Sequence, residues 1–292
     1  MKYNVYALAI SLFIGASIPS LSQEKQLNGY TSGPKKGSLV IAGGGKINET
    51  ILSRFIDLAG GVDAVIIAIP TAGGREKYNN NAGGAGQLRA AGATNVIVLH
   101  TNDKTVANSD AFIEPFKSAT GIWFSGGRQW RLVDAYKGTK MEKMLWDILE
   151  RGGVIGGTSA GATIQGSYLA RGDTKNNQIM MGDHEQGFAF IKNIAIDQHV
   201  LARNRQFDMF DILKKRPELL GLSIDEGTAI IVQGDSFEVV GKTYVLIFDG
   251  TFWSREGSEL KNLPVENDLF YFLRAGDKYN MRERKVILED SK

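Results

Sequence analysis

The sequence has no cysteine among its 292 residues. Disulfide bonds are therefore excluded, and so is lipid attachment to a cysteine after an export signal. The same absence removes the cysteine nucleophile that glutamine amidotransferases and papain-like enzymes use. If this chain carries out covalent catalysis, its nucleophile is another residue, and a serine is the leading choice.

The sequence also has no large excess of positive or of negative charge. Lys and Arg total 34 against 32 Asp and Glu, a formal net charge of +2, and no basic block of the kind found in nucleic-acid-binding proteins is present. We therefore expect no nucleic-acid partner.

The sequence also lacks the known phosphate-binding fingerprints. Around the run Gly43-Gly44-Gly45, Val40 and Ile47 stand where a P-loop needs Gly and Ser or Thr, and Asn48 breaks the dinucleotide pattern. The run indicates close backbone approach to a substrate or a neighbouring loop, with plain packing as the alternative.

The first 22 residues have the layout of a secretory signal peptide. Lys2 precedes an apolar stretch from Val5 to Ile14, and small residues follow at Ser20 and Ser22. This stretch is too short to span a bilayer comfortably. We expect cleavage near Ser22, export to the periplasm or the extracellular space, and no stable membrane insertion afterwards. A retained membrane anchor is the alternative.

The rest of the chain predicts one α/β domain. Residues 23–37 are polar and indicate a linker or loose arm, and residues 38–292 are expected to form the single domain. Within it, short, almost continuously apolar runs alternate with helix-like segments, which is typical of strands buried on both faces. We expect a flavodoxin-like, doubly wound, mostly parallel sheet with helices on both faces. The runs cover residues 39–42, 64–69, 96–99, 122–124 and 154–155; closely spaced antiparallel additions are expected over 228–232, 237–240 and 244–248.

Ser159 is the candidate nucleophile. It lies in Gly157-Thr158-Ser159-Ala160-Gly161, after an apolar run and before a helix-like segment. The pattern G-x-S-x-G is typical of a sharp strand-to-helix turn that displays one serine. Glycines fit there because the turn is tight and side chains would block the hydroxyl. A small-residue loop that packs a helix on a sheet is the plain alternative, and the flanking segments favour the nucleophile.

A serine hydroxyl needs a base within hydrogen-bond reach. Of the three histidines, His199 ends an apolar stretch in Asp197-Gln198-His199, and strand ends in open α/β sheets are where ligands bind. We favour His199 over His100, which has no acidic neighbours, and over His184, which lies in a polar loop expected to face solvent.

The orienting acid is expected in the sequence Ile224-Asp225-Glu226-Gly227, where either Asp225 or Glu226 can serve. The resulting order of serine, histidine and acid differs from the order in α/β-hydrolases. For the oxyanion hole, we predict the backbone N–H groups of Ala160 and of Gly127, which follows a predicted strand.

Taken together, these motifs resemble the cyanophycinases and the wider S51 family of serine peptidases. The resemblance implies a fold related to class I glutamine amidotransferases, with a serine in place of their elbow cysteine. It also implies a triad of Ser159, His199 and Glu226, and hydrolysis of aspartyl peptides. Cyanophycinases release β-aspartyl-arginine dipeptides from a polymer of aspartate that bears arginine. The resemblance rests on residues 39–45, 68–72, 124–129, 157–162, 197–199 and 224–229.

Polar residues near these motifs are the expected substrate contacts. Arg128 and Gln129 follow the double glycine, Gln198 precedes the histidine, and Arg203 and Arg205 come after it, where they can bind a carboxylate in bidentate fashion. The chain departs from the family pattern in three places, which are Arg128, Gly227 and Asp208. A further stretch, residues 79–86, is expected to be a mobile surface loop.

The sequence thus predicts an exported serine exopeptidase of the cyanophycinase type, acting through an acyl-enzyme on Ser159. No metal ion or organic cofactor is needed for this chemistry. The alternatives are a dipeptidase for α-aspartyl or isoaspartyl peptides, and a noncatalytic binding protein that keeps the pocket. A monomer and a homodimer both stay open.

Overall fold

The structure, a computed structural model, describes residues 30–255 and 269–288. The predicted signal peptide, residues 1–22, and residues 23–29 of the predicted arm lie outside the described residues. The described end of that arm lies against the domain: Thr31 is buried, and Ser32 forms a β-bridge with Lys192.

A nine-stranded sheet has the order β14-β13-β10-β9-β1-β5-β4-β2-β3. The five strands at its β3 end pair in parallel, whereas β9, β10, β13 and β14 are added antiparallel. This is the mostly parallel α/β sheet with antiparallel C-terminal additions that the sequence predicts. The strands are β1 (Ser38–Ala42), β2 (Ile66–Ile69), β3 (Val96–Val98), β4 (Gly121–Phe124), β5 (Val154–Thr158), β9 (Thr228–Gln233), β10 (Ser236–Gly241), β13 (Lys278–Asn280) and β14 (Lys285–Ile287).

Alternate residues of the parallel strands supply two cores. Leu39 and Ile41 of β1 point to the face covered by α6 (Trp130–Tyr136) and α7 (Lys140–Glu150), and Val40 points to the face covered by α2 (Glu49–Ala59) and α3 (Ala85–Ala90). Strands β2 and β4 are apolar and buried throughout because both of their faces are covered. The other helices are α4 (Lys104–Ala107), α5 (Asp110–Ile113), α8 (Ala160–Thr163) and α9 (Met209–Leu213), with 3₁₀ turns η2 (Thr71–Gly73), η3 (Ala82–Gly84) and η4 (Glu114–Lys117).

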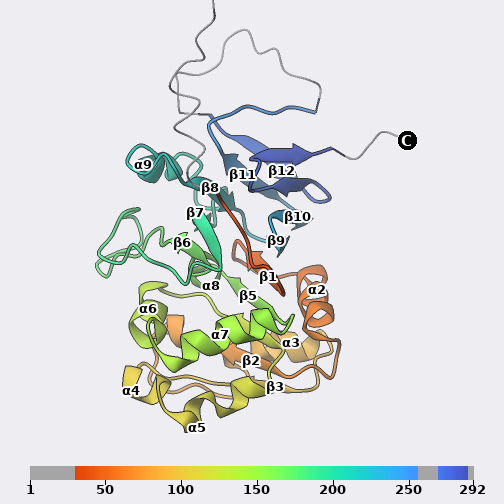
Figure 1. Cartoon of the computed structure of the whole chain (residues 1–292), viewed down its shortest axis with the longest axis vertical. Helices are drawn as coiled ribbons and strands as arrows, with labels where there is room; N and C mark the ends of the chain where they lie inside the picture. The colour runs from red at the N-terminus through yellow and green to blue at the C-terminus, as the bar shows by residue number, and fades with distance from the viewer. Residues whose placement is uncertain (1–29, 256–268, 289–292) are drawn as a thin grey trace, which may run out of the picture.

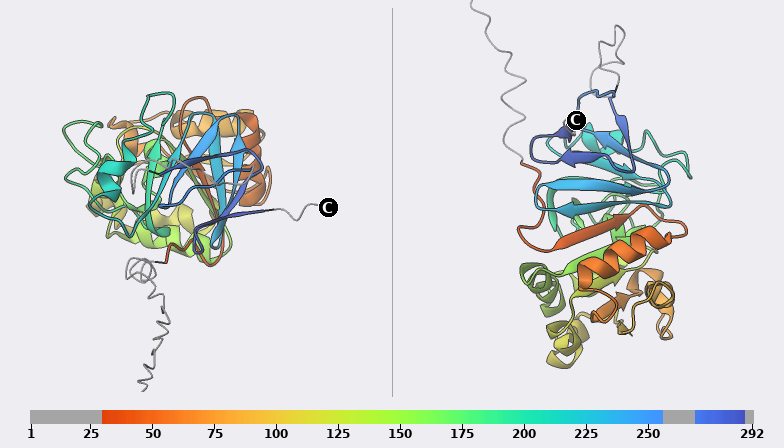
Figure 2. Two further views of the ribbon diagram at one scale, coloured as in Figure 1. Left: turned by 90° about the horizontal axis from the view of Figure 1, so that it is seen from above. Right: turned by 90° about the vertical axis from the view of Figure 1, so that its right-hand side faces the viewer.

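A second sheet has five strands in the order β12-β11-β8-β7-β6. Residues 244–248 were expected among the antiparallel additions to the predicted sheet, and the structure places them as β11 in this second sheet. The blue C-terminal strands lie at the opposite end of the long axis from β2 and β3 (Figures 1 and 2). The strands of the second sheet are β6 (Gly166–Tyr168), β7 (Ile191–Gln198), β8 (Leu220–Ile224), β11 (Tyr244–Phe248) and β12 (Tyr271–Arg274).

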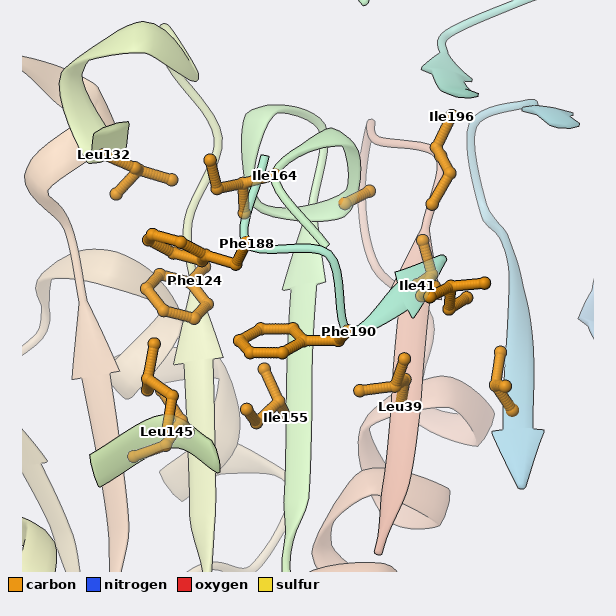
Figure 3. Packing of buried hydrophobic residues seen from close by; sticks show 14 of the residues in the cluster. Leu39, Ile41, Phe124, Leu132, Leu145, Ile155, Ile164, Phe188, Phe190 and Ile196 are labelled. Carbon is orange, nitrogen blue, oxygen red and sulfur yellow. The ribbon is translucent and has the colours of Figure 1, made fainter. Parts of the chain in front are cut away.

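The two sheets share one continuous core. Phe188 and Phe190 precede β7 and lie against Phe124 and Ile155 of the first sheet (Figure 3). Ile196 of β7 belongs to the same buried cluster. This packing fixes the end of β7 relative to the end of β5, which is where the candidate base and nucleophile stand.

The expectation of a surface loop over residues 79–86 is met only in part, because residues 79–81 form an exposed turn whereas the rest of the segment is helical. The segment contains η3 and the start of α3, and Ala85 is fully buried. A Cβ on Gly84 would lie 2.8 Å from Trp123 Nε1, so this glycine serves close packing against β4.

Candidate active site

Ser159 stands at the junction of β5 and α8 in a strained backbone conformation, with φ 55° and ψ −114°. Its amide donates to the Ala42 carbonyl at 3.0 Å. The flanking glycines are needed sterically: a Cβ on Gly157 would lie 2.3 Å from the Gly161 oxygen, and one on Gly161 would lie 2.3 Å from the Phe124 oxygen. The sequence therefore builds a nucleophile elbow here, as its pattern predicts.

The structure brings Ser159, His199 and Glu226 into one hydrogen-bonded line. Ser159 Oγ lies 2.9 Å from His199 Nε2, and His199 Nδ1 lies 2.5 Å from Glu226 Oε1. The histidine directly follows β7 and the glutamate follows β8, and these strands are parallel neighbours. With Nδ1–H donating to the carboxylate, Nε2 is left to accept the serine proton, which is the tautomer a general base needs.

The glycine run after β1 covers this line from one side. A Cβ on Gly44 would lie 2.2 Å from His199 Cε1, and one on Gly45 would lie 2.5 Å from Glu226 Oε2. The run is also bonded to both neighbours, because His199 N–H donates to Gly43 O at 2.9 Å and Gly227 N–H donates to Gly44 O at 3.1 Å. Close approach to a neighbouring loop is thus the reason for the three glycines.

The predicted oxyanion donors, the amides of Gly127 and Ala160, belong to two segments that lie next to Ser159. Gly126 approaches the serine so closely that a Cβ there would lie 3.2 Å from Ser159 Cβ. The next residue, Gly127, has φ 145°, and Arg128 N–H donates to Ala72 O at 2.8 Å, which fixes the turn. Ala160 is the first residue of α8. Two backbone amides that point at the same developing oxyanion stabilise a tetrahedral intermediate, and Gly127 and Ala160 remain the candidates for this role.

Two of the predicted substrate contacts are already engaged with the protein. Gln129 is 1% exposed, and its side-chain amide donates to Ala170 O at 2.6 Å. Arg128 donates to the carbonyl of Asp173, while its Nε is buried with no partner in the described part of the chain. Both side chains hold the segment after β6 against the turn that carries Gly127.

The residues around His199 are better placed to meet a substrate. Gln198 is 5% exposed, and its Oε1 has no hydrogen-bond partner among residues 30–255 and 269–288. Arg205 is buried with one long hydrogen bond, from Nη1 to Gln198 O at 3.4 Å, and Arg203 is exposed on the turn after the histidine. Burial, and next the charge of Arg171, lower the pKa of the Arg205 guanidinium. An anionic group would relieve this crowding of positive charge.

Arg171 is a buried residue that the sequence analysis missed. It is fully buried and bonds both oxygens of Asp197, at 2.7 and 2.9 Å, and Asp208 Oδ2 at 2.6 Å. Asp208, one of the departures from the family pattern, thus balances an arginine inside the protein. In the sequence, Arg171 precedes Gly172 and Asp173 and is typical of a surface turn, so no local signal marks it.

The other two histidines lie elsewhere. His100 Nδ1 lies 2.8 Å from Thr71 Oγ1, which supports the structural role expected for it. His184 lies between two carboxylates, with Nδ1 2.9 Å from Asp183 and Nε2 3.0 Å from Asp134. These bonds raise its pKa against the opposing effect of burial. Its side chain is 20% exposed, so it is partly open to solvent, as its polar loop suggested.

Within residues 30–255 and 269–288, no group of three or more His, Asp or Glu side chains is placed to hold a metal ion. None of the helices in these ranges combines the length and the apolar character that crossing a membrane requires.

Burial is the largest influence on the pKa of His199 and lowers it; Glu226 raises it, Arg203 and Arg205 lower it, and the net direction is downward. The base must be neutral to accept the serine proton. A lowered pKa keeps it neutral further into acid, so we expect the acid limb of kcat/KM to lie below about pH 6.5. The check is a profile of kcat/KM on a hydrolysed peptide, with circular dichroism at each pH as the control for unfolding. An acid limb above the ordinary histidine pKa, with the fold intact, would contradict this assignment.

Comparison with known proteins shows which family and fold the chain resembles. The model of peptidase family S51 matches residues 39–240. A cyanophycinase of Geminocystis herdmanii (strain PCC 6308) is 32% identical over 265 residues, which cover 86% of this chain and 96% of that protein. A cyanophycinase of Trichormus variabilis is 28% identical over 285 residues, 93% of this chain and 94% of its own. The crystal structure of a peptidase from an acI-B1 Actinobacterium superposes with a TM-score of 0.62 at 24% identity and covers 86% of this chain and 98% of its own, which shows a shared fold.

Proposed function

We propose that this chain, which belongs to peptidase family S51 and is a serine peptidase, is an exported exopeptidase. It hydrolyses aspartyl peptides of the β-aspartyl-arginine type through an acyl-enzyme on Ser159. The observation that carries the proposal is the hydrogen-bonded line from Ser159 through His199 to Glu226. The layout of residues 1–22 supports export.

The first half of the reaction forms the acyl-enzyme. Ser159 Oγ attacks the scissile carbonyl while His199 Nε2 takes its proton, and Glu226 stabilises the imidazolium that results. The N–H groups of Gly127 and Ala160 bind the negative oxygen of the tetrahedral intermediate. His199 then passes the proton to the leaving amine nitrogen as the peptide bond breaks.

The second half returns the enzyme to its starting state. A water molecule enters, His199 takes a proton from it, and the oxygen attacks the acyl carbon. The bond to Ser159 Oγ breaks as His199 returns the proton to that oxygen. Every proton moves through one imidazole, so the reaction needs no other acid or base.

Recognition of an acidic substrate is supported by the uneven charge near His199. Arg171 is balanced by Asp197 and Asp208, whereas Arg203 and Arg205 have no carboxylate bonded to them in the described part of the chain. Guanidinium groups that have no carboxylate partner within the protein can bind the carboxylates of an aspartyl-arginine unit.

The test is an assay of the purified protein on cyanophycin and on a panel of α-aspartyl and isoaspartyl dipeptides. We expect release of β-aspartyl-arginine dipeptides from the polymer, measured by mass spectrometry, and release slowed by about 10⁴-fold or more in the Ser159→Ala variant. Hydrolysis of the dipeptides with the polymer left intact would replace this proposal with an aspartyl dipeptidase. Product formation by the variant at the wild-type rate would remove Ser159 as the nucleophile.

A further inference from the structure

A second carboxylate lies in the turn that carries Glu226, and the reaction described above does not use it. Asp225 is 5% exposed and forms no ion pair with any described residue. A buried carboxylate costs free energy unless hydrogen bonds replace its water. The partners that Asp225 does have therefore indicate what it is for.

Both partners are backbone amides of the turn that follows His199. Asp225 Oδ1 accepts from Leu201 N–H at 3.0 Å and from Ala202 N–H at 2.9 Å. The turn then closes on itself, because Arg203 N–H donates to His199 O at 3.0 Å. A side-chain oxygen that accepts the first free amides of a helical turn fixes where that turn begins. Here it begins at the catalytic histidine.

The backbone of His199 needs such support. Its φ is 56°, in the left-handed region that residues with a Cβ seldom adopt. Such a conformation persists only where the surroundings impose it. On one side the His199 amide donates to Gly43 O, and on the other side Asp225 holds the two amides that come next.

We propose that Asp225 is a positioning residue for the reaction, which holds the backbone that carries His199 and Arg203 while Glu226 orients the imidazole. The two acids are adjacent at the end of β8 and both reach the end of β7, where Gln198 is in register with Ile224. One turn thus holds the base by its ring and by its backbone. The proposal rests on the proposed function, because it gives Asp225 a task in that same reaction.

Three variants separate geometry from charge. Asp225→Asn keeps an oxygen in place and loses the charge, and asparagine caps helical turns as well as aspartate does. We expect it to retain kcat/KM within about threefold. Asp225→Glu keeps the charge but displaces the oxygen by one methylene. We expect it to lose about 10-fold to 100-fold in kcat/KM, as does Asp225→Ala, because displacement of a reacting group by about 1 Å can cost this much. In the Glu and Ala variants we expect kcat to fall. We also expect KM to rise, because Arg203 lies on the same turn and is a predicted substrate contact.

The rates are expressed per reactive serine, counted with a fluorophosphonate that labels an activated hydroxyl. A purely stabilising role would lower the number of labelled sites and leave the rate per site unchanged, and that result would overturn the proposal. It would also be overturned if Asp225→Asn were as slow as Asp225→Ala. If Asp225→Ala does not fold, the Asn and Glu variants still distinguish an effect of the oxygen's position from an effect of its charge. A wild-type protein that takes no label and hydrolyses no peptide would overturn the proposed function itself, whereas equal labelling rates in wild type and Asp225→Glu would overturn only the role of Asp225.

Discussion

Replacement of Ser159 by alanine is expected to lower kcat/KM by about 10⁴-fold or more, the loss seen when other serine peptidases lose a triad member. No other hydroxyl is aligned with His199: among the described residues its Nε2 bonds only Ser159 Oγ. The oxyanion donors and substrate contacts would survive the change, so weak residual activity is compatible with the mechanism.

The fold should tolerate this substitution. The unusual φ of 55° is as accessible to alanine as to serine, and the hydroxyl contributes one hydrogen bond to the described structure. We expect a free energy of unfolding within about 1 kcal/mol of wild type, measured by urea denaturation. Kinetics and fluorophosphonate labelling would be measured on the same samples.

Ser223 offers a matched control. It is fully buried in β8, close to the turn that bears Glu226, and its Oγ has no partner in the described part of the chain. Ser223→Ala should keep both activity and labelling. Undiminished hydrolysis by Ser159→Ala would remove Ser159 from the mechanism, and a similar loss in both variants would point to disturbance of the second sheet.

Much of the first sheet could be predicted from the sequence because its strands are covered on both faces. Strands such as β2 and β4 consist of consecutive buried apolar residues, and such runs stand out from their polar surroundings. The nucleophile elbow was equally visible, since its glycines lie within two residues of Ser159 and each is required by a close contact, Gly157 with Gly161 and Gly161 with Phe124 of β4.

The division into two sheets could not be predicted in the same way. Strands β9, β10 and β11 have similar apolar patterns and are separated by short turns, yet β10 pairs with β9 in one sheet and β11 pairs with β8 in the other. Which partner a strand takes depends on long-range packing, here on the shared core that joins β7 to β5.

The choice between Asp225 and Glu226 shows the same limit inside the site. The two acids are adjacent, and both lie next to the end of β7, so spacing does not separate them; the family resemblance favoured Glu226. In the structure Glu226 reaches the imidazole and Asp225 reaches the backbone beyond it. Arg171 was missed for a related reason, because its two carboxylate partners, Asp197 and Asp208, come from segments distant in sequence.

The glycine run after β1 carries the second large prediction: Gly44→Ala is expected to lower kcat/KM by about 10³-fold, close to the loss of the base itself. The added methyl would lie 2.2 Å from His199 Cε1, 2.6 Å from Nδ1 and 2.7 Å from Nε2. No heavy atom can approach a ring so closely, so the imidazole must leave the line between Ser159 and Glu226. The serine then loses its general base although every triad residue is still present.

Alanine is also strained at this position, because Gly44 has φ 122°, and Gly60→Ala controls for that effect. Gly60 has φ 112° at the end of α2, and a Cβ there meets nothing within 4 Å. Both variants should lose about 1–2 kcal/mol in urea denaturation from backbone strain, while Gly60→Ala keeps its kcat/KM. If a folded Gly44→Ala protein were as active as Gly60→Ala, the imidazole could work from another position. The close contact of the glycine run would then matter for packing only. A selective loss of kcat would instead make the absence of a side chain at Gly44 a requirement of the chemistry.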